Sequence, residues 1–209
     1  MRRALILFVA ALLPASAGLA ALLQRDLGQG LAYYRLHELP GDLPTGATGP
    51  AGACVVDVRY VHADERAAIA FQAWLKFRGS TRAPIFLLAN AATAVPILSV
   101  LADRESAGGI MVIGAAAGNL RPDLAVTIAA ADERRAYDAL EEGATLAALL
   151  QENPDKIRND EASLAKDRAA DTGVDAPGES GSRPKPPPID AALQRAVQVY
   201  RALLALKKI

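Results

Sequence analysis

Few side chains in this chain could do chemistry, and the two histidines come first. His37 and His62 lie in different segments, and neither is spaced with a further ligand. A catalytic metal usually needs three protein ligands. We therefore interpret both as histidines at the surface or at strand ends, and the sequence predicts no metal site.

Cys54 is the only cysteine, which excludes an internal disulfide and a multi-cysteine metal site. It lies in an apolar run, whereas reactive thiols need exposure and nearby positive charge. A small buried hydrophobe is therefore favoured over a reactive or palmitoylated thiol. The alanines around Gly118 match no glycine-rich phosphate loop, so no nucleotide or other cofactor is expected.

Asp57 and Arg59 follow a run of apolar residues that predicts a buried strand. Ligands of parallel sheets gather at the carboxyl edge, so the pair could be functional. A structural ion pair or a loop anchor is the favoured interpretation.

Apolar runs and amphipathic stretches alternate along the middle of the chain. The runs predict strands at residues 31–36, 53–61, 84–89, 110–113 and 124–129. Helices are predicted from Asp64 to Arg78, at 93–105 and at 132–150, the last with an interruption at Gly143. This alternation favours an α/β fold with a mainly parallel sheet covered by helices.

The N-terminus predicts export. Arg2 and Arg3 precede an uncharged stretch, residues 4–23, whose apolar block is followed by small residues that suit a signal peptidase. We expect a signal peptide within residues 1–20, cleaved after Ala17 or Ala20. The alternative is an uncleaved anchor in the inner membrane, because the stretch is about as long as a bilayer requires. Either way the protein is expected outside the cytoplasm, in the periplasm of a bacterial-type cell.

The C-terminal part divides into a linker and a helix. Residues 151–188 are charged and then rich in Pro, Gly and Ser, which is typical of a flexible tether. Residues 189–209 predict an amphipathic helix with Leu193, Val197, Tyr200 and Leu204 on one face. That face could pack on its own domain, mediate self-association or contact a membrane surface. Lys plus Arg and Asp plus Glu both number 23, so charge gives no reason to expect nucleic acid as a partner.

Five segments follow one another along the middle of the chain. They are Gly-Leu-Ala-Tyr-Tyr-Arg-Leu from 30, Val-Val-Asp-Val-Arg from 55, Pro-Ile-Phe-Leu-Leu-Ala-Asn-Ala-Ala-Thr-Ala from 84, Ile-Met-Val-Ile-Gly from 110 and Pro-Asp-Leu-Ala-Val from 122. In this order they resemble the catalytic domain of the carboxyl-terminal processing (tail-specific) serine peptidases. The resemblance spans about residues 30–145, so we take residues 30–150 as the core domain. It implies a crotonase-like fold built from ββα units.

The residues that would catalyse peptide hydrolysis do not match the family. Where its pattern has a nucleophilic serine the chain has Val95, and where it has a lysine base the chain has Asn119. The glycine pair that would follow Arg59 near the oxyanion is replaced by Ala63 and Asp64. Serine–lysine hydrolysis needs nucleophile, base and oxyanion donors together. The resemblance therefore implies no catalytic residue at these positions.

We expect a non-catalytic, extracytoplasmic protein-binding or scaffold domain that retains the peptidase scaffold. Asp57, Arg59, Asn90 and Thr93 are the residues that a retained binding or structural motif would use. The partner is expected to be another protein or a second copy, with membrane contact through residues 4–23 or the final helix as a further option. The alternative function is a divergent serine-type peptidase whose nucleophile has moved, for example to Thr93 or Ser99. We expect no substrate-binding domain of the PDZ type before the core.

Overall fold

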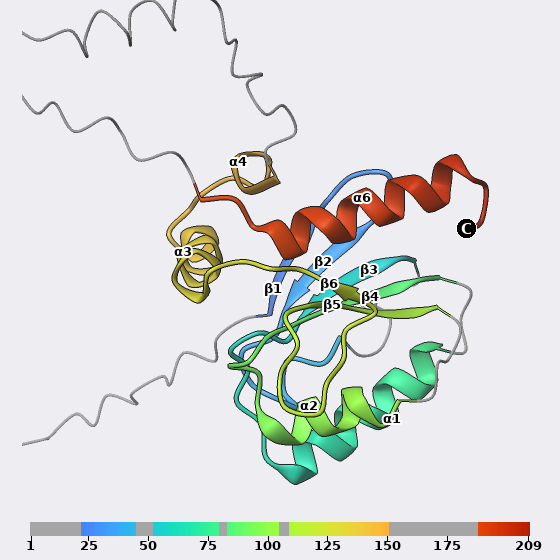
Figure 1. Cartoon of the computed structure of the whole chain (residues 1–209). Coiled ribbons are helices and arrows are strands. Elements are labelled where there is room, and N and C mark those ends of the chain that lie inside the picture. The colour runs from blue at the N-terminus through green and yellow to red at the C-terminus, as the bar shows by residue number, and fades with distance from the viewer. Residues whose placement is uncertain (1–21, 45–51, 80–82, 105–108, 151–187) are drawn as a thin grey trace, which may run out of the picture.

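A six-stranded, mostly parallel sheet forms the centre of a mixed α/β fold (Figure 1). The computed structural model describes residues 22–44, 52–79, 83–104, 109–150 and 188–209. The strands are β1 (Leu23–Asp26), β2 (Ala32–Arg35), β3 (Cys54–Asp57), β4 (Ile85–Ala89), β5 (Ile110–Gly114) and β6 (Leu124–Ala125). The helices of this part of the chain are α1 (Glu65–Gly79), α2 (Val95–Ala102), α3 (Ala130–Glu141), α4 (Leu146–Leu150) and α6 (Ala191–Ala205).

The strands follow one another across the sheet in chain order, and this order decides where the crossover helices lie. β1 is antiparallel to β2, and each later strand is parallel to the one before it. Crossovers between parallel strands are right-handed in nearly all proteins, so successive steps in one direction put their helices on one face. α1 joins β3 to β4 and α2 joins β4 to β5, and Figure 1 shows both below the sheet.

The opposite face of the sheet is covered by α6, far along the chain (Figure 1). Leu193, Val197 and Tyr200 are buried in the core between this helix and the sheet, and Leu204 packs at its edge, partly buried. The apolar face of the final helix thus packs on its own domain. Two layers of helices, one on each side, bury both faces of the sheet.

Side chains of the central strands alternate between these two cores. In β3, Val56 belongs to the core with α1 and α2, whereas Val55 belongs to the core with α6. In β4, Leu87 faces the first core, and Phe86 and Leu88 face the second. Burial on both faces explains the continuous apolar runs of these strands. The predicted mainly parallel, helix-covered sheet is confirmed.

α1 forms where the helical pattern predicted it. Asp64 precedes the helix, and its Oδ1 accepts a hydrogen bond of 2.8 Å from the Ala67 amide, which caps the first turn. The residues that recur at helical spacing are buried against the sheet: Ala67, Ala68, Phe71, Trp74 and Leu75.

Several elements differ from the sequence-based expectation, and two of them are shorter strands: β3 ends at Asp57 rather than at residue 61, and β6 ends at Ala125 rather than at residue 129. β1 was not predicted, because its sequence, Leu-Gln-Arg-Asp, is mostly polar and exposed and has no apolar run. It is an edge strand, and the turn that returns it to β2 places Gly28 and Gly30 at φ +83° and +82°, a conformation that glycine tolerates. The second predicted helix begins at Val95 rather than at residue 93, because Pro96 suits a first helical turn and the Asn90–Thr93 segment forms a separate hydrogen-bonded turn.

The predicted signal segment, residues 1–20, and residues 151–187 of the predicted linker lie outside the described residues. None of the helices in the described ranges has the length and apolar character needed to cross a bilayer.

Tyr200→Phe is expected to lower the free energy of unfolding by about 1 kcal/mol. The Tyr200 hydroxyl donates a hydrogen bond of 2.7 Å to the carbonyl oxygen of Gln29 and so ties α6 to the β1–β2 turn. Urea denaturation monitored by circular dichroism measures the change. Arg195→Ala, on the exposed side of the same helix, is the control and is expected to stay within about 0.5 kcal/mol of wild type. Equal stability of Tyr200→Phe and wild type would contradict this role for the hydroxyl.

Candidate functional site

The carboxyl edge of the sheet holds a buried network of ion pairs centred on Arg59. β3 ends at Asp57, and the Arg59 side chain turns back so that its Nε and Nη2 donate to the two Asp57 carboxylate oxygens at 3.0 and 2.7 Å. The other side of the guanidinium donates to Asp190, with Nη1–Oδ1 at 3.1 Å and Nη2–Oδ2 at 2.7 Å. Glu133 Oε1 lies 3.6 Å from Nη1. Asp57 and Arg59 are wholly buried, and Asp190 is nearly so.

Asp190 serves two purposes in this network. It is the N-cap of α6, where its Oδ1 accepts a hydrogen bond of 3.0 Å from the Leu193 amide. A carboxylate is also favoured at this position because the helix N-terminus carries partial positive charge. The same carboxylate binds Arg59, so one residue both starts the helix and locks it to the sheet.

A second arginine completes the network from β2. Arg35 Nε donates to the Tyr33 hydroxyl at 3.0 Å, and that hydroxyl donates to Asp57 Oδ2 at 2.8 Å. Arg35 Nη1 donates to the carbonyl of Tyr137 at 2.9 Å, and the guanidinium carbon stacks 3.7 Å from the centre of the Tyr137 ring. Nη2 is the one guanidinium nitrogen of Arg35 without a hydrogen-bond partner, and the cation–π contact with Tyr137 partly compensates the burial of this guanidinium.

The protonation states in the network suit a structural role. Burial alone would raise the pKa of Asp57, but the charge and hydrogen bonds of Arg59 outweigh it and hold that pKa below its usual range. Burial would lower the pKa of Arg59, yet Asp190 and Asp57 raise it well above the usual value. Burial also raises the pKa of Tyr33, which keeps its hydroxyl protonated as a donor. At neutral pH Asp57, Arg59 and Tyr33 therefore neither release nor accept a proton.

Asn90 and Thr93 form a turn beside this network. The Asn90 amide donates to Thr93 Oγ1 at 3.1 Å, and Asn90 Nδ2 donates to Glu133 Oε2 at 3.0 Å. Asn90 Oδ1 accepts from the Ala92 amide at 3.0 Å. Thr93 is buried with its hydroxyl oxygen used as an acceptor, so its observed role is to stabilise the turn before α2.

The two positions at which the resemblance would place serine and lysine both lie at the surface. Val95 is the first residue of α2 and is 73% exposed. Asn119 is exposed in the loop between β5 and β6. Cys54 is buried as predicted, and burial raises its pKa to about 11, so the thiol is protonated and poorly reactive at neutral pH.

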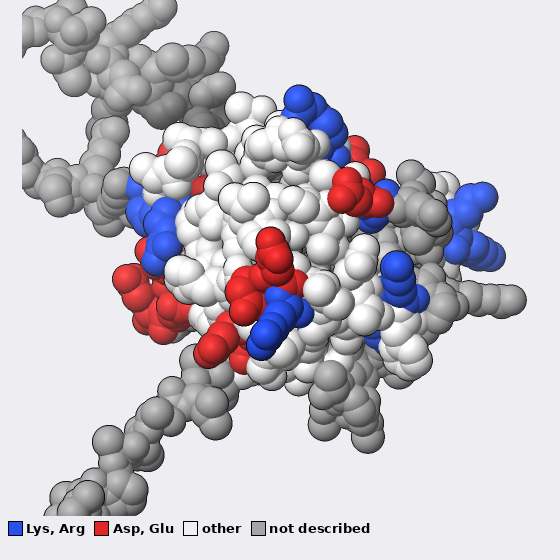
Figure 2. All heavy atoms as spheres, turned by 90° about the horizontal axis from the view of Figure 1, so that it is seen from below, with Lys and Arg blue, Asp and Glu red and all other residues white. Residues whose placement is uncertain are grey.

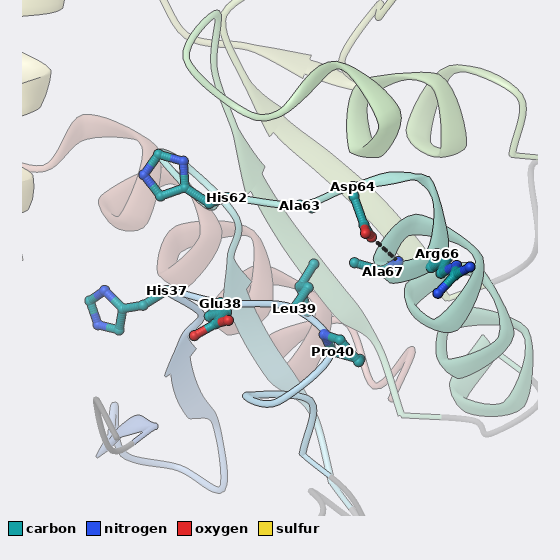
Figure 3. Close-up of a pocket in the computed structure, with 9 residues that line it drawn as sticks. All are labelled: His37, Glu38, Leu39, Pro40, His62, Ala63, Asp64, Arg66 and Ala67. Atoms are coloured by element: carbon teal, nitrogen blue, oxygen red, sulfur yellow. Dashed lines mark hydrogen bonds between the residues drawn. The ribbon is translucent and has the colours of Figure 1, made fainter. Parts of the chain in front are cut away.

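The two histidines border an open hollow of about 880 Å3 at the carboxyl ends of β2 and β3 (Figure 3). Their segments run side by side, and the His62 amide donates to the carbonyl of His37 at 3.3 Å. In Figure 3 both imidazole rings lie on the same side, while Asp64 turns away to cap α1. No group of three or more potential metal ligands occurs among the described residues.

A second hollow, of about 370 Å3, is a groove between α1 and α2. Two apolar side chains stand exposed at its border, Ile69 at 66% and Val95 at 73%. We call it the α1–α2 groove, and it is lined by Glu65, Ala68, Ile69, Gln72, Val95, Pro96, Ser99 and Val100. Figure 2 views this side of the molecule, where charged side chains form a few separate groups and leave wide uncharged areas between them.

The structure brings together all four residues that the sequence suggested for a retained motif. Asp57 and Arg59 form the centre of the network, and Asn90 joins it through Glu133, with Thr93 in the adjoining turn. The sequence did not identify Asp190 or Glu133 as members. An aspartate directly before the final amphipathic helix was a recognisable N-cap signal, but nothing in the sequence linked it to Arg59.

Comparison of the chain with known protein families finds no family that matches it, and comparison with curated proteins finds no match either.

Proposed function

We propose that this protein is a non-catalytic, extracytoplasmic protein-binding domain, built on a degenerate scaffold of the tail-specific serine peptidase type with a crotonase-like fold. The order of the motifs from residue 30 to 145 supports that origin, and the N-terminal sequence supports export. The buried charge network then acts as an internal clamp that holds α6 on the sheet.

The observation that carries the proposal is the α1–α2 groove. Val95 occupies the position at which the resemblance would put the nucleophile. Its side chain is exposed to solvent and lines the same groove as Ile69. Exposed aliphatic side chains around a concave surface are typical of sites at which another protein docks. Glu65 is the one charged residue that lines this groove, so its occupant is expected to present aliphatic side chains and a basic residue.

Neither candidate for a relocated nucleophile has the surroundings that a peptidase needs. Thr93 is buried and accepts a hydrogen bond from the Asn90 amide, which is not a base. Ser99 is exposed on α2, and among the described residues no histidine, lysine or carboxylate forms a hydrogen bond with its hydroxyl. Val95→Ser would restore a hydroxyl without a base or oxyanion donors, and such groups act as a unit.

We therefore expect wild type and Val95→Ser to leave an unstructured protein substrate intact and to resist a serine-reactive fluorophosphonate. The measurements are gel-based hydrolysis and labelling of purified full-length protein, each against a heat-denatured control. Hydrolysis that survives repurification and disappears in Thr93→Val or Ser99→Ala would overturn the proposal in favour of the divergent peptidase.

Binding is tested with a photo-reactive amino acid in place of Ile69. This residue is exposed, so its substitution is expected to change the stability of the fold little. We expect a protein adduct from this position and none from a matched probe at Arg195, on the other side of the molecule. The adduct is then identified by mass spectrometry and must form again from purified components. If Ile69 yields no more adduct than Arg195, the groove is not a protein-binding site.

A further inference from the structure

One side of α1 carries a stripe of four residues: Glu65, Ile69, Gln72 and Lys76. They follow one another at intervals of four, three and four positions, which aligns them along a helix. Glu65, Ile69 and Lys76 are exposed and Gln72 is partly exposed. The stripe is acidic at the start of the helix, basic toward its end and uncharged between.

The stripe also forms one wall of the α1–α2 groove. Glu65, Ile69 and Gln72 line the groove, and Val95 and Val100 of α2 stand across from them. The exposed side chain of Ile69 therefore protrudes next to the groove. The groove could receive an aliphatic side chain of the same kind from another molecule. A surface that offers a protrusion and the matching hollow together can pair with a copy of itself.

The order of charges selects one relative direction for such a pair. Two α1 helices in parallel would set Glu65 against Glu65 and Lys76 against Lys76, which is unfavourable. Antiparallel helices around a two-fold axis set Glu65 of each copy opposite Lys76 of the other, so that two attractive pairs form. The same axis sets Ile69 opposite Gln72 and brings both isoleucines near the centre of the interface.

We propose that the occupant of the α1–α2 groove is a second copy of this chain, bound with α1 antiparallel to α1 around a two-fold axis. This inference rests on the proposed protein-binding function and names its partner. Each copy buries Ile69 and Val95 against the other, with the Glu65–Lys76 pairs at the two ends of the contact. Exposed apolar side chains in the centre and charges at the rim are the usual arrangement of a protein interface.

The test is sedimentation velocity of full-length protein over a series of concentrations. We expect wild type to form dimers and each of Glu65→Lys and Lys76→Glu to raise the dimer Kd about tenfold, because both symmetry-related pairs become repulsive. The double reversal Glu65→Lys/Lys76→Glu restores opposite charges across the interface, so its Kd is expected to return close to the wild-type value. Arg195→Glu on α6 is the control and leaves the Kd unchanged.

Helix stability cannot produce this rescue. A lysine at the start of α1 and a glutamate near its end both oppose the helix dipole, so the double reversal is the least favourable of the three for the isolated fold. Circular dichroism confirms folding of each variant before sedimentation. As a second measurement, Ile69→Ser is expected to abolish dimers while the protein stays folded.

Wild type that stays monomeric at every concentration, or a double reversal as weak as the single ones, would overturn the inference. The photo-reactive probe at Ile69 separates this result from failure of the proposed function. A monomeric protein that still gives a reproducible adduct with a different protein retains the binding function and loses only self-association.

Discussion

Arg59→Leu is expected to lower the free energy of unfolding by about 3–5 kcal/mol. The substitution leaves Asp57 and Asp190 buried without the cation that compensates both, and it removes four hydrogen bonds to their oxygens. Loss of one member of a buried ion-pair network is costly because the remaining charges stay desolvated. Urea denaturation of full-length protein, followed by circular dichroism, measures the change.

The matched control is Arg134→Leu. Arg134 is exposed, forms a pair of 2.8 Å with Asp138 one turn along α3 and lies 4.6 Å from the centre of the Tyr60 ring, and exposed contacts of these two kinds together contribute only about 1 kcal/mol. If Arg59→Leu does not fold, Asp190→Asn tests the same network, since asparagine retains N-cap ability and removes only the charge. Should Arg59→Leu and Arg134→Leu cost the same, the network would not be the clamp inferred here.

The network also makes stability depend on pH in a definite direction. The pKa of Asp57 is lower in the folded protein than its usual value, because Arg59 outweighs the effect of burial. The stabilisation is therefore present above the unfolded pKa of about 3.9 and is lost as the pH falls through the lower, folded value. Acid titration of Asp57→Asn, which lacks this group, should show a shallower loss of stability below about pH 4 than wild type.

Gly114→Ala is expected to cost about 2–5 kcal/mol, from backbone strain and overpacking together. Gly114 ends β5 at φ +149°, and a Cβ atom there would lie 1.8 Å from the carbonyl oxygen of its partner Ala89 in β4. That oxygen belongs to the backbone of a central strand, so the clash cannot be relieved by turning a side chain. β4 and β5 would have to separate where they lead into the loops of the carboxyl edge.

Gly118→Ala isolates the strain from the clash. Gly118 has φ +54°, but a Cβ atom there meets nothing within 4 Å, so only about 1–2 kcal/mol is expected. Urea denaturation compares the two variants, and hydrogen exchange of the β4 and β5 amides locates the damage. Similar losses at both positions would show that the close approach to Ala89 does not matter.

Local patterns in the sequence determined most of the secondary structure. The spacing of apolar residues in α1, the aspartate before it and the glycine at its end are all signals within one segment, and the helix formed there. The apolar runs of β3, β4 and β5 likewise predicted buried strands, and their alternation with helices predicted a parallel sheet. β1 gave no such signal, because it is a mostly exposed edge strand held by pairing with β2.

The candidate site could be predicted only in part. Asp57 and Arg59 were found because they are two residues apart at the end of a strand, and Asn90 and Thr93 because the family resemblance covers them. Asp190 lies 131 positions from Arg59, and periodicity carries no information over that distance. Only the docking of α6 on the face that the crossovers leave open brings this carboxylate to the arginine.

The α1–α2 groove belongs to the tertiary structure as well. The sequence determined which residues of α1 face away from the core, since a helical period assigns each residue to a side. It could not show that Val95 of α2 would stand beside Ile69, because this depends on the right-handed crossovers that place both helices on one face of the sheet. Apolar character is a property of each residue, whereas exposure and neighbours arise only when the segments pack.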